Sequence, residues 1–345
     1  MLFRSSKVKV SGGGRCNVTH ACFEVDALVK NYPRGDRFLK KAFYRFGPHE
    51  MVDWLRERGV ALHAESDGRM FPVSNQSQTI IDCFLREAER YKVSVQMGSA
   101  VGKIEKSGAG FILSLREGPT LMADAVCVAS GGHPGAPAYQ WIEALGHRIE
   151  PPVPSLFTFN MPDDPLTRLM GVSVPDVQIR IPSLKLEEKG PVLITHWGLS
   201  GPVVLRISAW GARRLSEQQW TFRAFVNWVP DHDENSLLAL FQSYRDEQPS
   251  LFISGRNPFS LPGRLWAHFL QRCGITEKVR WGELKAASRN ALVKCCCSYE
   301  LTIAGKTTFK EEFVTAGGVS LSDINPDTME SRRVPGLFFA GEVMD

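Results

Sequence analysis

The densest glycine segment of the chain is suited to bind an anion or a planar ligand through its backbone. It consists of Ser11, Gly12, Gly13, Gly14, Arg15, Cys16 and Asn17. Glycine leaves backbone N–H groups open to close approach, and a guanidinium and an amide follow directly. The segment is not a P-loop, because no Gly-Lys-Ser/Thr follows, and it departs from the Gly-x-Gly-x-x-Gly dinucleotide fingerprint. The alternative is a flexible surface loop, since glycine runs are common in turns.

Two further glycine segments end apolar runs that are typical of buried strands. Ser130-Gly131-Gly132 ends one run, and Gly341-Glu342 ends the other. Open α/β sheets bind ligands at the carboxyl ends of their strands. The Glu342 carboxylate is suited to accept hydrogen bonds from a sugar-like polyol, or alternatively to cap a helix. The three glycine segments together predict a nucleotide cofactor.

Two histidines are candidates for work beside such a cofactor. His196 is the best candidate for proton transfer, because imidazole titrates near neutrality and the glycines that follow leave the ring accessible. His196 is equally suited to orient its own loop. His133 directly follows the second glycine segment and is a further candidate near the cofactor.

The cysteines do not predict a metal site. Cys16, His20 and Cys22 lack a fourth ligand and the paired spacing of zinc sites. Residues 295–297 are three consecutive cysteines, whose side chains point in different directions and cannot converge on one ion. Filling of the hydrophobic core is the better interpretation of this triplet.

The composition indicates an ordinary globular protein of about two domains. The chain has 345 residues, of which 43% are hydrophobic and 23% are charged, and its net charge is +4. This balance allows RNA as a partner without requiring it. Eight cysteines without a disulfide pattern fit a reducing compartment, and no apolar run reaches the ~20 residues that span a bilayer. We therefore expect a cytoplasmic protein that has no membrane partner.

Hydrophobic periodicity predicts a mixed α/β chain with a change of character after a proline-rich connector at 151–154. Helices are expected over 36–58, with a break at Gly47-Pro48, and over 79–91. Strands are expected at 7–10, 93–96, 100–105, 111–115 and 123–130. Beyond the connector we expect β-structure over 155–229, helices over 231–294, and returning strands at 299–303 and 309–315.

Five segments in the same order resemble the aminoacetone oxidase-like family of FAD-binding flavoproteins. They are Val8 to Thr19, Thr195 to Pro202, Thr315 to Val319, Pro326 to Ser331 and Pro335 to Val343. The resemblance implies an α/β, multidomain fold, in which a glutathione-reductase-type FAD domain carries a β-barrel domain with a small helical insertion. The implied boundaries are 1–150 with 316–345 for the FAD domain, 151–230 with 298–315 for the barrel, and 231–297 for the insertion.

The resemblance also implies a cofactor and a set of residues that bind it. FAD is the implied cofactor, and NAD(P)H is a transient electron donor. The residues implied to bind FAD are Ser11, Gly12, Gly13, Gly14, Arg15, Cys16, Asn17, Val101, Ser130, Gly131, Gly132, Gly341 and Glu342, with His196 as the catalytic candidate.

The implied function is an FAD-dependent oxidoreductase acting on a small molecule. It is either a reductase fed by NAD(P)H or an oxidase of small amines. The alternative is a protein that acts on RNA, as a reductase of uracil in ribosomal RNA or as an RNA-binding remnant without redox activity.

The family pattern is longer than this chain at both ends. It places a strand and a Gly-x-Gly-x-x-Gly segment before the glycine loop, where this chain has ten residues, although a βαβ unit takes ~30. We therefore expect a chain truncated at both ends. Produced as written, it is expected to bind FAD weakly or not at all and to expose part of its sheet edge, whereas a version extended at both ends is expected to purify yellow.

Overall fold

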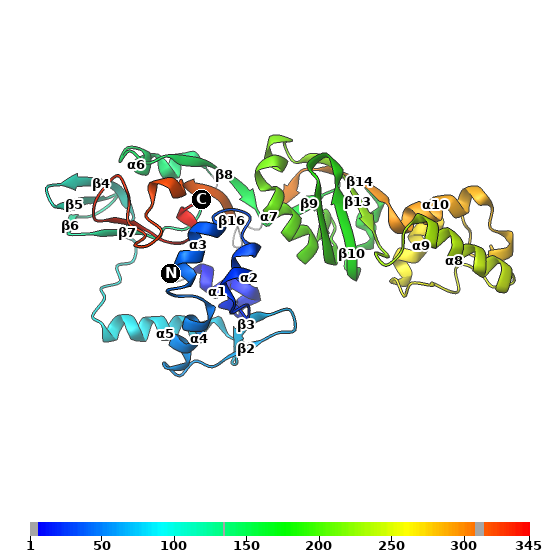
Figure 1. The fold of residues 1–345 in the computed structure, drawn as a ribbon, viewed down its shortest axis with the longest axis horizontal. Coiled ribbons are helices and arrows are strands. Elements are labelled where there is room, and N and C mark those ends of the chain that lie inside the picture. The colour runs from blue at the N-terminus through cyan, green and yellow to red at the C-terminus, as the bar shows by residue number, and fades with distance from the viewer. Residues whose placement is uncertain (1–5, 134, 308–313) are drawn as a thin grey trace. The chain divides into compact units, whose positions relative to one another are not determined.

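The computed structural model describes residues 6–133, 135–307 and 314–345 (Figure 1). These residues divide into two compact units. Unit 1 holds residues 6–153 and 314–345, and unit 2 holds residues 154–307. No helix in the described part of the chain is long and apolar enough to cross a membrane.

The first part of unit 1 is mostly helical and begins in α1 (Ser6–Gly14), which leaves helical angles at Ser11. A small antiparallel sheet has the order β1-β3-β2. The remaining elements are β1 (Thr19–His20), α2 (Val25–Leu28), η1 (Val29–Asn31), α3 (Asp36–Phe43), α4 (Pro48–Arg56), β2 (Leu62–Ala64), β3 (Arg69–Pro72) and α5 (Ser77–Arg90).

The expected break between two helices lies between α3 and α4. Pro48 opens α4, where its missing N–H costs nothing, and the Glu50 carboxylate accepts a hydrogen bond from the Gly47 N–H at 2.8 Å. Leu55 of α4 and Ile80 of α5 are buried in one apolar cluster. The predicted helices over 36–58 and 79–91 are therefore confirmed.

The second part of unit 1 contains three small sheets. An antiparallel meander has the order β4-β5-β6, β7 pairs in parallel with β17, and β8 pairs with β16. The elements are β4 (Val101–Ser107), β5 (Gly110–Leu115), β6 (Thr120–Ala123), β7 (Val126–Val128), α6 (Gln140–Glu143), β8 (Ile149–Ser155), β16 (Val314–Val319), η6 (Leu321–Asp323), β17 (Leu337–Phe339) and η7 (Gly341–Val343).

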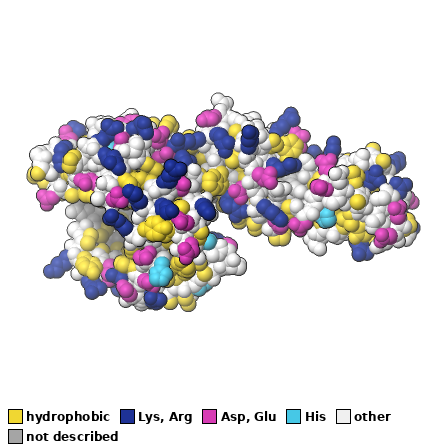
Figure 2. Space-filling model, in the orientation of Figure 1, with side chains coloured by type: hydrophobic (Ala, Val, Ile, Leu, Met, Phe, Trp, Pro, Cys, Tyr) yellow, Lys and Arg dark blue, Asp and Glu magenta, His cyan; other side chains and the backbone are white. Residues whose placement is uncertain are grey.

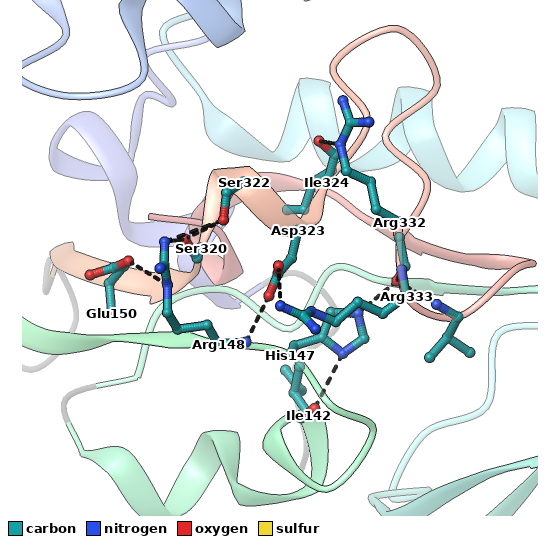
Figure 3. A network of polar contacts seen from close by, with 12 residues as sticks. Ile142, His147, Arg148, Glu150, Ser320, Ser322, Asp323, Ile324, Arg332 and Arg333 are labelled. Atoms are coloured by element: carbon teal, nitrogen blue, oxygen red, sulfur yellow. Dashed lines mark hydrogen bonds and ion pairs between the residues drawn. The ribbon is translucent and has the colours of Figure 1, made fainter.

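A buried carboxylate joins the end of the chain to the segment around residue 148 (Figure 3). Asp323 accepts a hydrogen bond from the backbone N–H of Arg148 at 2.7 Å and pairs with the Arg333 guanidinium at 2.8 Å. Burial would raise the pKa of Asp323, but these two partners hold it below its ordinary value. The Arg148 guanidinium also donates to Ser320 Oγ at 2.8 Å. Charge-assisted bonds thus fix η6, which follows β16.

The His147 imidazole forms the second half of this network. Its Nε2 lies 2.7 Å from Ser331 Oγ, and its Nδ1 lies 3.2 Å from the Ile142 carbonyl oxygen. Ser331 Oγ already accepts hydrogen bonds from the backbone N–H groups of Arg333 and Val334. The hydroxyl must therefore donate its proton to Nε2, and Nδ1–H must donate to Ile142. Burial lowers the pKa of His147, which keeps this neutral tautomer in place.

Unit 2 is built on a seven-stranded antiparallel sheet with the order β14-β13-β10-β11-β12-β9-β15. Its strands are β9 (Thr158–Asn160), β10 (Ser173–Ile181), β11 (Leu186–Ile194), β12 (Gly198–Ser200), β13 (Thr221–Asn227), β14 (Tyr299–Ala304) and β15 (Lys306–Thr307). Its helices are α7 (Pro202–Glu217), α8 (Glu234–Glu247), α9 (Gly263–Arg272) and α10 (Ala286–Cys297). The sheet and these helices share one hydrophobic core.

The structure corrects four local expectations. Residues 7–10 are helical, because Val8 packs into the apolar cluster of α4 and α5. Residues 93–96 form no strand. The expected connector at 151–154 lies inside β8, where prolines are tolerated because the strand is at an edge. Within the described residues no pairing joins β14 to β15, so the expected closed barrel is an open sheet there.

Some expectations about the organisation of the chain remain predictions. The three-domain boundaries given above are one example, since the helices of 231–297 share the core of the sheet. The expected strand at 309–315 falls largely outside the described residues, and β16 begins at Val314.

The buried state of His147 predicts that acid destabilises unit 1. The unfolded imidazole has a pKa of about 6.5, and the folded pKa is lower, so stability is present above pH ~6.5 and falls as the pH drops toward the folded pKa. The change is at most about 1.4 kcal/mol per pH unit. Hydrogen exchange of β7 and β17 between pH 7 and 5 measures it, and His147→Gln should reduce the pH dependence.

His268 of unit 2 supplies a matched control for this measurement. Burial also lowers its pKa, and its Nε2 lies 2.9 Å from the Tyr299 hydroxyl. We expect His268→Gln to change the pH dependence of exchange in unit 2 and to leave β7 and β17 as they are. An unchanged pH dependence of β7 and β17 in His147→Gln would contradict the assignment.

Candidate functional site

Three segments that are distant in the sequence meet in unit 1 at the ends of β7 and β17. Lys7 Nζ in α1 lies 3.3 Å from the Glu342 carboxylate in η7. The same Nζ lies 3.6 Å from the place that a Cβ would take at Gly131. A surface ion pair of this kind contributes at most ~1 kcal/mol, so both side chains are free to turn toward a ligand. We call this the strand-end site, and it also includes Gly132 and Thr315.

Backbone geometry keeps the strand-end site open. Gly131 has φ +78° and Gly341 has φ +75°, a conformation that favours glycine. A Cβ at Gly132 would lie 2.7 Å from Thr315 Oγ1 and 2.9 Å from Thr315 Cβ. The Ala340 N–H donates to the Val128 carbonyl at 3.0 Å, which fixes the two strand ends side by side. Positive φ at Gly131 and Gly341 shows that both strand ends turn sharply, and the contact of these glycines with a cofactor stays a prediction.

The Thr315 side chain is buried beside Gly132 without a polar partner. The residue is 9% exposed, and its Oγ1 has no hydrogen-bond partner among the residues described here. An unpaired buried hydroxyl costs about 1–3 kcal/mol unless something satisfies it. A ligand hydroxyl or ring nitrogen at the strand-end site would supply the missing partner.

Tyr139 and His133 border the same site. The His133 N–H donates to the Tyr139 hydroxyl at 3.1 Å, and Tyr139 is 1% exposed. Burial raises the pKa of Tyr139, the bond from His133 lowers it, and the charge of Glu342 raises it further. The phenol therefore stays protonated and is available as a hydrogen-bond donor.

An apolar pocket of about 620 Å³ lies in unit 1 between β4, β7 and the segment 137–141. The predicted residues Val101 and Ser130 line it, as do His133 and Trp141. Its size is within the usual range for small-molecule and cofactor sites. The pocket, the positively charged Lys7 and the unpaired Thr315 hydroxyl fit a ligand that joins a planar ring to polar and anionic groups.

The glycine loop is tightly bent, and its members play different parts. Gly12, Gly13 and Gly14 all have positive φ, and Cys16 has φ +63°. A Cβ at Gly12 would lie 2.8 Å from the Phe71 ring, whereas a Cβ at Gly13 would meet nothing within 4 Å. Gly13 is therefore the loop position that a ligand can approach most closely.

The polar side chains of the loop hold its shape. Arg15 pairs with the Glu65 carboxylate at 2.6 Å, and its guanidinium lies 4.0 Å from the centre of the Phe71 ring. The Asn17 side-chain nitrogen, with the amide assigned to satisfy its neighbours, donates to the Thr19 carbonyl at 2.9 Å. Cys16 is buried in the apolar cluster of α4 and α5, and burial raises the pKa of its thiol. Their contact with a cofactor stays a prediction.

His196 lies in unit 2, in the turn between β11 and β12. Its ring is exposed and lies 4.0 Å from that of Trp197. Thr195 Oγ1 donates to the Gly198 carbonyl at 3.0 Å, and a Cβ at Gly198 would overlap the Phe159 carbonyl oxygen. The turn is thus held without His196, which leaves the imidazole free for chemistry. Its role in proton transfer stays a prediction.

The cysteines include one close pair of thiols, Cys273 and Cys295, that the sequence did not predict. Among the described residues no group of three or more His, Cys, Asp or Glu side chains could hold a metal. The side chains of residues 295–297 are buried in the core of unit 2. Cys295 Sγ lies 3.5 Å from Cys273 Sγ, at the end of α9. Sequence spacing gave no signal for this pair, because the helices α9 and α10 bring the two thiols together.

A family model and several known proteins match almost the whole chain. The family model described as HI0933-like protein Rossmann domain matches residues 4–345. The chain is 32% identical over 352 aligned positions to the ribosomal RNA dihydrouridine synthase of Escherichia coli (strain K12), covering 98% of this chain and 82% of that protein. It is 27% identical to the 3-dehydro-bile acid delta(4,6)-reductase of Clostridium scindens and to the ribosomal RNA dihydrouridine synthase of Haemophilus influenzae, each covering 98% of this chain and 83% of the relative.

The packing at Gly132 predicts a specific cost of adding one methyl group. Gly132→Ala should destabilise unit 1 by about 1–3 kcal/mol, because the new Cβ overlaps the buried Thr315 side chain. Gly135→Ala is the matched control, since its Cβ would lie 3.5 Å from Pro137 Cδ, an ordinary contact. Urea unfolding of both variants checks this. Equal stability of the two variants would show that Gly132 is not packed as described.

Proposed function

Because the chain belongs to the HI0933-like Rossmann family of FAD-binding proteins, we propose that it is a flavin oxidoreductase whose FAD lies at the strand-end site of unit 1. The observation that carries this proposal is the convergence of Lys7, Gly131 and Glu342 at one point. Gly131 and Glu342 belong to the second and third glycine segments, and Lys7 lies four residues before the first one. Strand ends are where open α/β sheets bind nucleotide cofactors.

Each part of the strand-end site has a counterpart in FAD. The Lys7 ammonium suits a phosphate oxygen, and the Glu342 carboxylate suits sugar-like hydroxyls. Gly131 and Gly341 let the main chain approach the cofactor, and the apolar pocket suits a planar ring. Gly13, Arg15 and Asn17 of the glycine loop are proposed to border the same cofactor.

Bound FAD would supply the redox chemistry, and the protein would supply orientation and proton transfer. Tyr139 is held protonated by burial, so it is placed to donate a hydrogen bond beside the strand-end site. The exposed imidazole of His196 is proposed to deliver a proton to the substrate. NAD(P)H is the proposed electron donor, and it would bind transiently, because the 345 residues contain no Gly-x-Gly-x-x-Gly fingerprint that would hold it.

The proposed direction of the reaction is reduction. The relatives include a protein named as a bile acid reductase and two named as ribosomal RNA dihydrouridine synthases. We propose uracil in ribosomal RNA as the substrate, because the relative with 32% identity carries that name over nearly the whole of this chain. A small conjugated ketone is the second candidate, on the ground of the bile acid reductase. Oxidation of small amines has no such support.

Ribosomal RNA from cells with and without this gene tests the substrate. We expect a uridine that has gained two hydrogen atoms in the first sample and an unmodified uridine in the second, as measured by mass spectrometry of the digested RNA. When a gene carrying His196→Gln is returned to the cells that lack this gene, the modification should form about 10²-fold more slowly than with the unaltered gene, while the protein keeps its flavin. Identical RNA in both samples would refute the RNA substrate, and loss of flavin from the variant would make His196 a structural residue.

The unpaired hydroxyl of Thr315 provides a test of the cofactor site itself. Thr315→Val keeps the shape and removes a buried hydroxyl without a partner, so it should stabilise the free protein by ~1 kcal/mol. If the hydroxyl bonds to FAD, the same change should weaken FAD binding by about tenfold. Thermal unfolding and titration of FAD fluorescence measure the two effects.

Thr158→Val is the matched control for Thr315→Val. Thr158 is also buried, but its hydroxyl donates to the Thr307 carbonyl at 3.1 Å. This variant should lose stability and should leave FAD binding unchanged. Unaltered FAD affinity in Thr315→Val would remove Thr315 from the proposed cofactor site.

A further inference from the structure

Four exposed aromatic rings gather around α3 in unit 1. Phe23 is 45% exposed, Tyr32 38%, Tyr44 64% and Phe46 48%. They come from the segments that flank α2 and α3, and contacts within unit 1 position two of them. Tyr32 packs against Phe43 with ring centroids 5.6 Å apart, and the Lys40 ammonium lies 5.9 Å from the Tyr44 ring. We call this region, residues 23–46, the α3 surface.

The α3 surface also carries an excess of positive charge. Residues 23–46 include six Lys or Arg residues and three acidic residues, Glu24, Asp26 and Asp36, for a net charge of +3, and all six cations fall within residues 30–46. Figure 2 shows Lys and Arg side chains interspersed with hydrophobic ones over the region where α2 and α3 lie in Figure 1. Uncovered rings and unbalanced charge on one surface indicate a partner that offers both flat faces and anions.

Half of these cations have carboxylate partners and half do not. Arg34 pairs with Asp345 at 3.0 Å, Lys41 pairs with Asp327 at 3.2 Å, and Lys40 pairs with Asp26. These three pairs fasten α3 to its surroundings. The other three cations are exposed and make no ion pair within the described part of unit 1, and they are Lys30, Arg37 and Arg45. They are the cations of this surface that remain free to neutralise a ligand.

We infer that the α3 surface binds a single-stranded segment of RNA, with phosphates on Lys30, Arg37 and Arg45 and bases stacked on Tyr32, Tyr44 and Phe46. Single-stranded nucleic acid presents unstacked bases and phosphates in alternation, and proteins bind it with aromatic rings set among cations. A folded acidic protein would match the charge but would leave the rings without flat partners. This inference rests on the proposed RNA substrate, and it assigns to the α3 surface the task of holding the strand around the reacting base.

Binding of a fluorescently labelled oligouridine to the full chain, measured by anisotropy at several salt concentrations, tests the inference. The triple variant Lys30→Ala, Arg37→Ala and Arg45→Ala should bind at least about tenfold more weakly at low salt. Each lost phosphate contact reduces the slope of log K against log salt by about 0.7, so the slope should become shallower by about two. The matched control removes three exposed cations of unit 2, Arg245, Lys278 and Lys294, and should bind as the unaltered chain does.

A second variant separates stacking from charge. Tyr44→Ala with Phe46→Ala should weaken binding by about tenfold or more and leave the salt slope unchanged, because stacking is largely independent of salt. Both rings are exposed, so the fold should persist, and circular dichroism checks this. Equal weakening by the α3 triple variant and the control triple variant would overturn the inference, because it would mean unspecific attraction to positive charge.

The remaining outcomes separate this inference from the proposed function. FAD titration of the α3 triple variant should give the affinity of the unaltered chain. If the unaltered chain binds FAD and reduces RNA, while both α3 variants bind oligouridine as the unaltered chain does, only the inference about the α3 surface is refuted. Oligouridine binding that depends on the α3 surface, with no reduced uridine in cellular RNA, would refute only the proposed reaction. Binding to anionic lipid vesicles in place of RNA would overturn the inference.

Discussion

The carboxylate of Asp323 is the contact on which the strand-end site depends. It accepts a hydrogen bond from the backbone N–H of Arg148 and pairs with Arg333, so it joins the residue that precedes β8 to the segment that follows β16. β16 carries Thr315, and the chain returns from η6 through Ser331 into β17 and Glu342. A charge buried in this way is expensive unless every partner is present, which makes the arrangement specific. Contacts around Asp323 thus fix the positions of Thr315 and Glu342, although Asp323 is not a member of the strand-end site.

Local sequence patterns predicted where the helices of unit 1 lie, but they did not predict which elements contact one another. The helices at 36–58 and 79–91 follow from the spacing of apolar residues, and the glycines at 131 and 341 lie at strand ends as expected. The alternation at 7–10 was misleading, because Val8 packs against α4 and α5 in a way that only the folded chain creates. The prolines at 151–154 likewise suggested a connector, although an edge strand accepts them.

The unpredicted parts of the candidate site are contacts between distant residues. The approach of Lys7 to Glu342 spans almost the whole chain, and the approach of Cys273 to Cys295 depends on how two helices pack. Periodicity reports the face of an element but not its partner. The unpaired hydroxyl of Thr315 belongs to the same class, because only a folded structure shows which polar atoms lack a partner. A motif match therefore indicated the type of ligand, whereas the contacts between distant residues exist only in the folded chain.

The strand-end site by itself does not determine the substrate. Its main features are backbone features, namely glycines with positive φ and two aligned strand ends, and such features suit any chemistry that the same cofactor performs. The relatives agree with this view, because proteins named for ribosomal RNA and for a bile acid both align with 98% of this chain. Substrate choice must then depend on side chains outside the strand-end site. In the described residues, the exposed His196 turn and the basic, aromatic α3 surface are regions where such side chains are available.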